Sequence, residues 1–470
     1  MRALRLTLAL GLALGMSLAH AIADPAPSPP TQMAKLAAES PPNGADLPSA
    51  NKATTLTPKV AGKQFAQLTY PVPTTASAAD LLLAADDYAF YTDWAHYRQY
   101  LSQVVSSYPG TKESGRALAL LAGDAARTGD QEAAAALSAQ LANYPDPEVQ
   151  AFAALISTTG AAHRAGQFQA QEQAYLAYLS AWHGASTAGW VALRLGDLYR
   201  FSLEDYDQAI ATFQALVTEY HTGPIVEQAL VSLAETLNWS ESGRLPEAMA
   251  VYEQVLDLAQ TPGVQVRALY GFADTLMDPM GELSAAAEVF TQIIASYPTH
   301  PSAALAYALR STVAERRGDW EQTLADAKAF LTYPSSSKFH TARAHWILAK
   351  DAFQSGRLEE AEAEFTLLAH LAETTGHNVE FRGEAQAGLA YCAQARGNLR
   401  GAMQLFQAAA DVEYYPQKKA VYLFQAAGLA AQLGDDPARS QIIARMTAEL
   451  PGSHLTTQLV GHEILPVPEI

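Results

Sequence analysis

The sequence predicts an all-α protein organised as an α-solenoid, in which about ten helix pairs stack along the chain. Three observations predict this fold. Glycines return at a spacing of about 37 residues, Tyr-Pro dipeptides return in phase with them, and the stretches between are rich in alanine and leucine. Alanine is the best helix former and lets helices pack closely, so these stretches are expected to be helices.

Composition sets the first limits on function. The chain has 470 residues, of which 49% are apolar and 17% are charged, so it contains enough apolar material for a long core. Its net charge of -18 argues against a nucleic-acid partner or an anionic lipid surface, because both require a basic footprint. A single cysteine cannot form an internal disulfide.

Residues 1–23 follow the plan of a secretory signal peptide. Arg2 and Arg5 form a positive start, residues 6–18 form an apolar run, and small residues at 19–23 offer a cleavage site. The apolar run is shorter than the about 20 residues that span a bilayer, which disfavours the alternative of an uncleaved membrane anchor. No cysteine lies near the cleavage site, so we expect no direct lipid anchor. The mature protein is expected to be periplasmic or secreted.

The segment after the signal differs in composition from the rest of the chain. Residues 24–77 are rich in Pro, Ala, Ser and Thr and show no helical or strand period, which predicts a disordered tether. Their charges nearly cancel, so the acidity belongs to the remainder of the chain. We expect the solenoid to occupy residues 78–455 and a C-terminal tail to occupy residues 456–470.

Two markers define the repeat. One is a turn glycine, and residues 203–206 take the place of a glycine where one period is missing. The glycines are Gly129, Gly166, Gly243, Gly281, Gly318, Gly356, Gly397 and Gly434, with successive differences of 37, 77, 38, 37, 38, 41 and 37. The second marker is the Tyr-Pro dipeptide at Tyr108, Tyr144, Tyr297, Tyr333 and Tyr415, with Leu450-Pro451 closing the series.

Side chains at fixed offsets from the glycine predict how each unit packs. An alanine recurs five residues after the glycine, at Ala134, Ala248, Ala286, Ala361 and Ala402. An aromatic residue recurs nine residues after it, at Tyr252, Phe290, Phe365 and Phe406. Residues four apart lie on one helix face, so the small residue admits a neighbouring helix and the ring fills the space beside it. Each unit is then helix, glycine turn, helix and proline stop.

This period and residue set resemble the tetratricopeptide repeat, an antiparallel helix pair of about 34 residues. The segment 356–365 (GRLEEAEAEF) resembles the opening of the family's second helix, and Leu195-Gly196-x-x-Tyr199 resembles a motif of its first helix. The resemblance implies a right-handed superhelix. With the Tyr-Pro endings, the units look most similar to periplasmic repeat proteins, namely the accessory subunit of the outer-membrane assembly machine and the partner of the Tol-Pal system. A helical bundle or another α-solenoid is the alternative fold.

The sequence offers little evidence of catalytic chemistry. It contains no His-Glu-x-x-His, Gly-x-Ser-x-Gly, P-loop or dinucleotide fingerprint, and its 12 histidines are scattered. Cys392 lies within a predicted helix and is expected to be a buried, inert thiol. The acidic residues of the segment 359–364 are interpreted as a helix start with a solvated face. We therefore expect no catalytic residue, no metal site and no cofactor.

The inner surface of the predicted superhelix is the candidate binding site. In the family's register, positions two, five and nine of each first helix point into the groove, and counting from the turn glycines selects one set of residues. This predicted partner-binding set is Trp190, Arg343, Trp346, Lys350 and Tyr391. A groove with aromatic side chains and a few cations could hold an extended or helical peptide, whereas the alternative role of the two tryptophans is ordinary packing.

These observations favour a non-enzymatic periplasmic scaffold that binds a partner segment in its concave groove. The resemblance implies protein partners of the cell envelope and a possible association with an outer-membrane complex. One alternative is a scaffold of an exopolysaccharide secretion complex, which would use the same surface. A second alternative, an enzyme acting on cell wall or glycan, requires a pair of acidic residues in a cleft that the sequence does not clearly supply.

Overall fold

The computed structural model describes residues 76–239, 244–333, 337–374 and 379–460, and every regular element among them is an α-helix. The predicted all-α fold is therefore confirmed. The signal peptide predicted at residues 1–23 lies outside the described residues, as do all but the last two residues of the tether.

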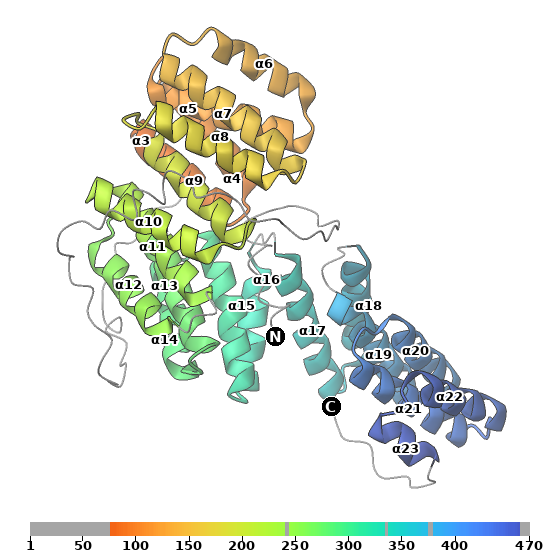
Figure 1. Cartoon of the computed structure of the whole chain (residues 1–470). Coiled ribbons are helices and arrows are strands. Elements are labelled where there is room, and N and C mark those ends of the chain that lie inside the picture. The colour runs from red at the N-terminus through yellow and green to blue at the C-terminus, as the bar shows by residue number, and fades with distance from the viewer. Residues whose placement is uncertain (1–75, 240–243, 334–336, 375–378, 461–470) are drawn as a thin grey trace. The chain divides into compact units, whose positions relative to one another are not determined.

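The chain divides into two compact units, residues 1–306 and residues 307–470, with the boundary inside α15 (Pro301–Arg316). Unit 1 consists of six consecutive helix pairs (Figure 1). These pairs are α3 (Ala78–Phe90) with α4 (Trp94–Ser107), α5 (Lys112–Thr128) with α6 (Gln131–Ala142), α7 (Pro147–Arg164) with α8 (Phe168–Ala181), α9 (Ala188–Phe201) with α10 (Tyr206–Tyr220), α11 (Pro224–Trp239) with α12 (Leu245–Leu258), and α13 (Pro262–Met277) with α14 (Leu283–Ser296).

Unit 2 continues the same plan with four further pairs and one short final helix. After α15 come α16 (Trp320–Leu331), α17 (Lys338–Gln354) with α18 (Leu358–Thr374), α19 (Val379–Ala395) with α20 (Leu399–Val412), α21 (Pro416–Gln432) with α22 (Asp436–Glu449), and α23 (His454–Val460). The described residues thus contain ten pairs, as the spacing predicts. The predicted end of the solenoid at residue 455 falls within α23.

The turn between the two helices of a pair follows the predicted glycines. Seven of them have positive φ, namely Gly129, Gly166, Gly281, Gly318, Gly356, Gly397 and Gly434, and Gly243 lies outside the described residues. Glu204 adopts φ 53°, so the segment 203–206 does replace a glycine turn. Thr92 has φ 59° at the turn between α3 and α4, where the sequence pattern gave no marker. Such backbone favours glycine, because a β-carbon is disfavoured there.

The residue after the turn fixes the start of the second helix. Asp130, Asp319, Asp435 and Asn398 each directly follow a turn glycine and accept a hydrogen bond from a backbone N–H three residues on. Asp205 does the same after Glu204. Side-chain caps of this kind satisfy an otherwise unpaired N–H, typically stabilising a helix by about 1 kcal/mol. Glycine and cap together explain the position of the turn at Gly129, Gly318, Gly397 and Gly434.

The tyrosines of the Tyr-Pro markers connect the two helices of a pair. Tyr108 and Tyr297 are the C-caps of α4 and α14, so the predicted helix ends are confirmed there. The hydroxyl of Tyr108 donates to the carbonyl of Ala76, 32 residues earlier, at 2.7 Å. At Tyr415 the outcome differs, because Tyr415 caps the start of α21 and Pro416 is its first residue. Proline is favoured at that position because it needs no hydrogen-bond partner for its nitrogen.

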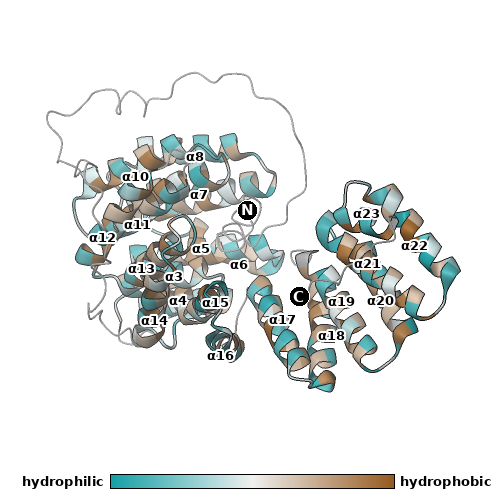
Figure 2. Ribbon diagram, turned by 90° about the horizontal axis from the view of Figure 1, so that it is seen from below, coloured by the Kyte–Doolittle hydropathy of each residue, from teal (hydrophilic) through white to brown (hydrophobic). Residues whose placement is uncertain are grey.

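The predicted alanine–aromatic pairs form the core between helices. Ala286, Phe290, Ala402 and Phe406 are fully buried, whereas Ala134 in the first part of the chain is only partly buried. Figure 2 shows that each helix carries both hydrophobic and hydrophilic residues, as expected of helices with one buried face. The repeat pattern therefore specifies the packing of each helix on its neighbours.

Candidate functional site

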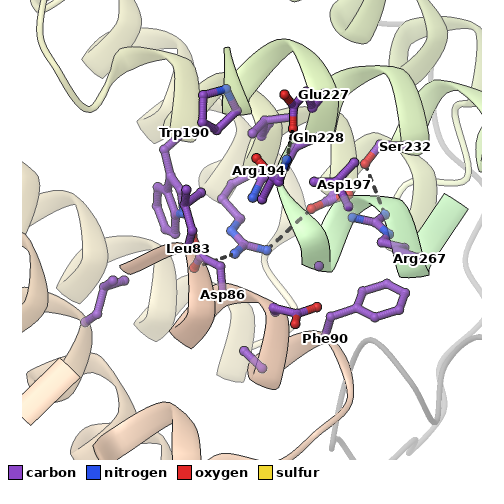
Figure 3. A pocket seen from close by; sticks show the side chains of 18 of the residues that line it. Leu83, Asp86, Phe90, Trp190, Arg194, Asp197, Glu227, Gln228, Ser232 and Arg267 are labelled. Carbon is purple, nitrogen blue, oxygen red and sulfur yellow. Dashed lines mark hydrogen bonds and ion pairs between the residues drawn. The ribbon is translucent and has the colours of Figure 1, made fainter. Parts of the chain in front are cut away.

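Unit 1 contains a cavity of about 1300 Å³ between the first helices of its pairs. Residues of α3, α5, α7, α9, α11 and α13 form most of its wall. Residues of α4, α8 and α12 and of the segments before α11 and α13 complete it. Figure 3 shows this wall from close by, with Phe90 on α3, Trp190 on α9 and Arg267 on α13. The cavity is the inner face of the repeat array in unit 1.

A large part of the cavity wall is aliphatic. Leu258, at the end of α12, lines the cavity and is 57% exposed. The other aliphatic residues of the wall include Leu83, Leu120, Ile156, Leu193, Val226 and Leu230. Leu120, Leu193, Val226 and Leu230 are buried and support the wall, whereas Leu83 and Ile156 are partly buried. Together with Leu258, these two can contact the apolar side of a partner, at about 25 cal/mol per Å² of apolar area removed from water.

Charged side chains of the wall pair with one another across helices. The carboxylate of Asp86 on α3 lies 3.2 Å from the guanidinium of Arg116 on α5 and 3.5 Å from that of Arg194 on α9. Arg194 also contacts Asp197, one turn further along α9, at 3.5 Å. One aspartate of the first helix pair thus connects to both the second and the fourth pairs.

The pairing continues into the fifth and sixth pairs. Asp197 contacts Arg200 at 3.2 Å, and the carboxylate of Glu235 on α11 lies 2.6 Å from both Arg200 and Arg267. Arg267 also donates to the hydroxyl of Ser232 at 3.1 Å (Figure 3). We refer to these seven residues as the arginine–carboxylate chain. Its members are Arg116, Asp86, Arg194, Asp197, Arg200, Glu235 and Arg267.

Glu235 is the carboxylate on which the end of this chain depends. Burial acts to raise its pKa, but the guanidiniums of Arg267 and Arg200 outweigh burial and hold the pKa below its usual value of 4.5. Glu235 is therefore ionised at neutral pH and compensates two buried cations. Removing a buried charge of this kind is costly because its partners remain desolvated.

A second set of contacts brings α3 to the far end of unit 1. The carboxylate of Asp87 lies 2.7 Å from Nε2 of His300, which has no exposed surface on its side chain. Nδ1 of His300 accepts the backbone N–H of Ser302 at 3.1 Å, so geometry assigns the proton to Nε2, which donates to Asp87. A β-carbon on Gly263 would lie 2.6 Å from the carboxyl carbon of Asp87, so only glycine fits there.

The same end of α3 also contacts α13 through an aromatic ring. The guanidinium of Arg267 lies 4.3 Å from the ring centre of Phe90, at cation–π distance. Helices α3 and α13 pack directly on each other, although four pairs lie between theirs along the chain. The first and sixth pairs of unit 1 therefore meet, and we refer to this closure of the array as the ring of unit 1.

Trp190 of the predicted set lies in this cavity wall. Its ring packs against Phe152 at 5.3 Å between centres, and the guanidiniums of Arg116 and Arg194 lie 5.3 Å and 4.8 Å from its centre. The side chain is only 6% exposed. Trp190 thus supports the wall and offers little surface of its own to a partner.

The other predicted groove residues lie in unit 2, and three of them share α17. The ammonium of Lys350 lies 5.0 Å from the ring centre of Trp346 and 5.4 Å from that of Trp320 on α16. Arg343 forms an ion pair with Glu315 on α15. The structure thus brings Arg343, Trp346 and Lys350 onto one helix, with Trp320 as a neighbour that the sequence did not select.

Tyr391 is held by packing on α19. Its ring contacts Phe406 edge-on at 4.9 Å and Phe353 at 6.1 Å between centres. It shares unit 2 with the three residues on α17, whereas Trp190 belongs to unit 1. Partner binding by these five residues stays a prediction.

The repeat has one further inner-face position, which lies six residues before the turn glycine. Gly123 and Gly160 stand six residues before their turn glycines and both line the cavity. The same position holds Thr312, Lys350, Tyr391 and Gly428 in unit 2. A β-carbon on Gly160 would meet only the tip of the Arg164 side chain, so this glycine leaves space in the inner face. A β-carbon on Gly123 would lie 2.7 Å from Cγ2 of Ile156, so that glycine admits a neighbouring side chain.

The remaining chemistry-bearing residues are placed as follows. Cys392 is buried, and burial together with Glu362 raises the pKa of its thiol to about 11, so it is held in the unreactive protonated form. No group of three or more His, Cys, Asp or Glu among the residues that the structure describes is arranged to hold a metal ion. No helix in the described ranges has both the length and the apolar character needed to cross a bilayer.

Comparison with known proteins supports the repeat. A family model of the tetratricopeptide repeat matches residues 191–220 and 267–300, which cover α9 with α10 and most of α13 with α14. The first match includes the predicted motif Leu195-Gly196-x-x-Tyr199. These two segments therefore match the tetratricopeptide repeat. No curated protein matches the chain.

Solved structures similar to this chain share little sequence with it. A tetratricopeptide repeat protein from Parabacteroides merdae is 12% identical over 66% of this chain and 98% of its own, with a TM-score of 0.31. The APC/C hetero-tetramer Cut9–Hcn1 is 12% identical over 83% and 90%, with a TM-score of 0.34. A monomeric mutant of IFIT1 with m7Gppp-AAAA is 13% identical over 84% and 88%, with a TM-score of 0.39.

Proposed function

We propose that this protein is a non-enzymatic periplasmic scaffold that binds a segment of a partner protein in the inner face of its repeat array, in the service of cell-envelope assembly. One observation carries the binding part of the proposal. The first helices of six pairs surround a single cavity of about 1300 Å³ whose wall combines aliphatic side chains with charges that are already paired. A wall of this kind suits an amphipathic peptide segment.

The scaffold role follows from how the repeats are built. Each pair buries its apolar face mainly against its neighbours along the chain, so the array is both a spacer and a continuous surface. Tetratricopeptide repeats, which the family model matches in two segments of this chain, are used in this way for protein binding. The periplasmic and envelope parts of the proposal rest on the signal-peptide pattern of residues 1–23 and on the resemblance of the units to envelope repeat proteins.

Site-specific photocrosslinking in intact cells tests this proposal. A photoreactive amino acid is placed at Gly160, which lines the cavity, and separately at Trp346 on α17. Two positions serve as controls. Gly428 on α21 stands six residues before its turn glycine as Gly160 does, and Glu359 on α18 has a side chain that is 88% exposed.

A defined envelope protein captured from Gly160 or Trp346, and not from the controls, is the expected result. Its identity would also separate envelope assembly from polysaccharide secretion. Equal capture at all four positions, or capture at the controls alone, would contradict binding in the inner face. Recovery of the protein from the cytoplasm instead of the periplasm on cell fractionation would contradict the localisation.

A further inference from the structure

We infer that the partner segment of the unit 1 cavity is a basic amphipathic one, with an apolar side for the cavity wall and Lys or Arg on its other side. This inference rests on the proposed function, because it specifies what the inner face binds. It is based on the distribution of charge between the two units and on the pairing of the charged groups inside the cavity.

The two units carry very different net charges. Residues 76–306 contain 26 Asp and Glu against nine Lys and Arg, a net charge of -17, whereas residues 307–460 contain 17 against 15, a net charge of -2. Nearly all of the acidity of this protein therefore belongs to unit 1. A charge of this size on one compact unit produces a negative potential of several kT around it, which attracts cations and repels anions.

The excess is largest in the second half of unit 1. Residues 202–296, which include α10 to α14, contain 14 Asp and Glu against two Lys and Arg. The exposed acids there lie mainly on the second helices of the pairs and in the turns, so their field surrounds the unit. They include Asp207, Glu219, Glu247, Asp257, Glu282 and Glu288.

The charges inside the cavity do not offset this field. The arginines of the arginine–carboxylate chain are paired with Asp86, Asp197 and Glu235, so they present no unpaired cationic patch to an acidic partner. Arg164 lines the cavity and is exposed, and it is one cation against the net charge of the unit. A segment that enters the cavity therefore approaches through a negative potential.

Part of the surface that such a segment meets is apolar. Leu258 is 57% exposed where it lines the cavity, and Leu83 and Ile156, which are partly buried, belong to the same wall. An apolar side is needed to gain affinity from this wall, and a basic side is needed to match the field outside it. A nucleic acid or an acidic peptide satisfies at most one of these two conditions.

A matched peptide series tests the inference on the full chain. Three fluorescent helical peptides of about 14 residues share one leucine pattern and carry Lys, Gln or Glu at the polar positions. Binding is measured by fluorescence anisotropy at low and moderate salt. We expect the Lys peptide to bind at least tenfold more tightly than the Gln peptide and the Glu peptide to bind most weakly, with the difference shrinking as salt screens the charges.

Variants at two equivalent glycines show whether binding occurs in the cavity. A β-carbon on Gly160 would meet only the tip of the Arg164 side chain, at 3.5 Å, so Gly160→Leu can project into the cavity without disturbing the fold. Gly428→Leu in unit 2 is the matched control, because a β-carbon there meets nothing within 4 Å. We expect Gly160→Leu to weaken Lys-peptide binding at least tenfold and Gly428→Leu to leave it unchanged.

The outcomes separate the inference from the proposed function. If the Gln or Glu peptide binds best and Gly160→Leu abolishes that binding, the inner face is the binding site and the inferred charge class is wrong. If Gly160→Leu changes no peptide affinity, binding is non-specific attraction, and both the inference and the proposed binding in the inner face are wrong.

The variant Arg164→Glu gives an independent check of the inferred charge. It should strengthen Lys-peptide binding about two- to threefold, and weaker binding would contradict the inference.

Discussion

Unit 1 and unit 2 are built from the same helix pair, yet one closes and the other stays open. In unit 1 the first helix α3 packs on α13, and the space between holds a cavity. In unit 2 the contacts among described helices join neighbours along the chain, such as α17 with α18 and α19. The pair itself therefore does not determine whether an array closes on itself.

A few side chains account for the difference. Closure in unit 1 uses charged groups of α3, above all Asp86, which is linked to two different pairs, and Asp87, which contacts His300. Position six before the turn glycine does not separate the units, because it is glycine at Gly123 and Gly160 in unit 1 and also at Gly428 in unit 2. The core residues of a repeat therefore determine how its two helices pack, whereas inner-face residues determine whether the array closes around a cavity.

Removal of Glu235 should have the largest effect and should be confined to unit 1. Glu235→Ala leaves Arg200 and Arg267 buried without their shared carboxylate, which we expect to lower the free energy of unfolding of unit 1 by about 3–5 kcal/mol. Hydrogen exchange of the backbone amides of α11 in unit 1 and α19 in unit 2, recorded at increasing denaturant, measures the loss of stability in each unit. Glu359→Ala, at an exposed ion pair, should change stability by less than about 1 kcal/mol. Equal loss of amide protection in α11 and α19 would contradict the expectation that the effect is confined to unit 1.

Acidification should destabilise unit 2 before unit 1. Burial, with the Arg343 guanidinium, lowers the pKa of His340 from 6.5 to about 4, so the unfolded chain binds a proton near pH 6.5 that the folded protein does not. Stability is therefore lost as pH falls below 6.5, by about 1.4 kcal/mol per pH unit, or roughly 2 kcal/mol at pH 5. The lowered pKa of Glu235 acts only below about pH 4.5.

Hydrogen exchange in α17 and α11 at pH 7 and pH 5 measures this difference. His340→Asn keeps a side-chain acceptor near Ser337 and removes the titrating group, so it should flatten the pH dependence of α17. A pH dependence that persists in His340→Asn would assign the effect to another group.

Glycines that admit a neighbouring ring should be equally important in both units. A β-carbon on Gly196 would lie 2.4 Å from the ring of Phe213, and one on Gly388 would lie 2.3 Å from the ring of Phe365. We expect Gly196→Ala and Gly388→Ala each to cost about 1–3 kcal/mol, because a packed core resists added volume. Denaturant midpoints of the two variants measure this. Tolerance of one substitution but not the other would show that the units do not share this packing.

The smallest effect is expected at the two equivalent glycines, Gly160 in unit 1 and Gly428 in unit 2. Both Gly160 and Gly428 lie within helices and have room for a methyl group. Alanine there should raise the free energy of unfolding by about 0.5–1 kcal/mol, because it removes conformational freedom from the unfolded chain. Thermal unfolding measures the gain. If Gly160→Ala were destabilising while Gly428→Ala were not, the space at Gly160 would have a structural role beyond openness.

Local features of the fold could be predicted from the sequence because short-range chemistry determines them. The turn at Gly356 follows from the freedom of glycine, and the buried pair Ala402 and Phe406 follows from helical spacing. The replacement turn at Glu204 was also predicted correctly. These features depend on residues within one pair, so a repeating pattern displays them.

The closed ring could not be predicted in the same way. The contact between Asp87 and His300 joins residues 213 positions apart, and a period of about 37 residues carries no information about how tightly the array curves. The same limit applies to the groove residues. Trp190 and Trp346 were selected by one register, but one is buried between two arginines and the other packs against a lysine. Their neighbours come from other helices, which the register does not specify.

Closure also has a consequence for the order in which the chain folds. The helix pairs from α3 to α12 contact their neighbours along the chain, so each can form once it and the next pair are free to fold. The contact of Asp87 with His300 joins residues 213 positions apart, so it needs nearly the whole of unit 1 to be in place. The ring of unit 1 is therefore completed last, by its longest-range contact, and a delay there would leave an assembled array with its two ends apart.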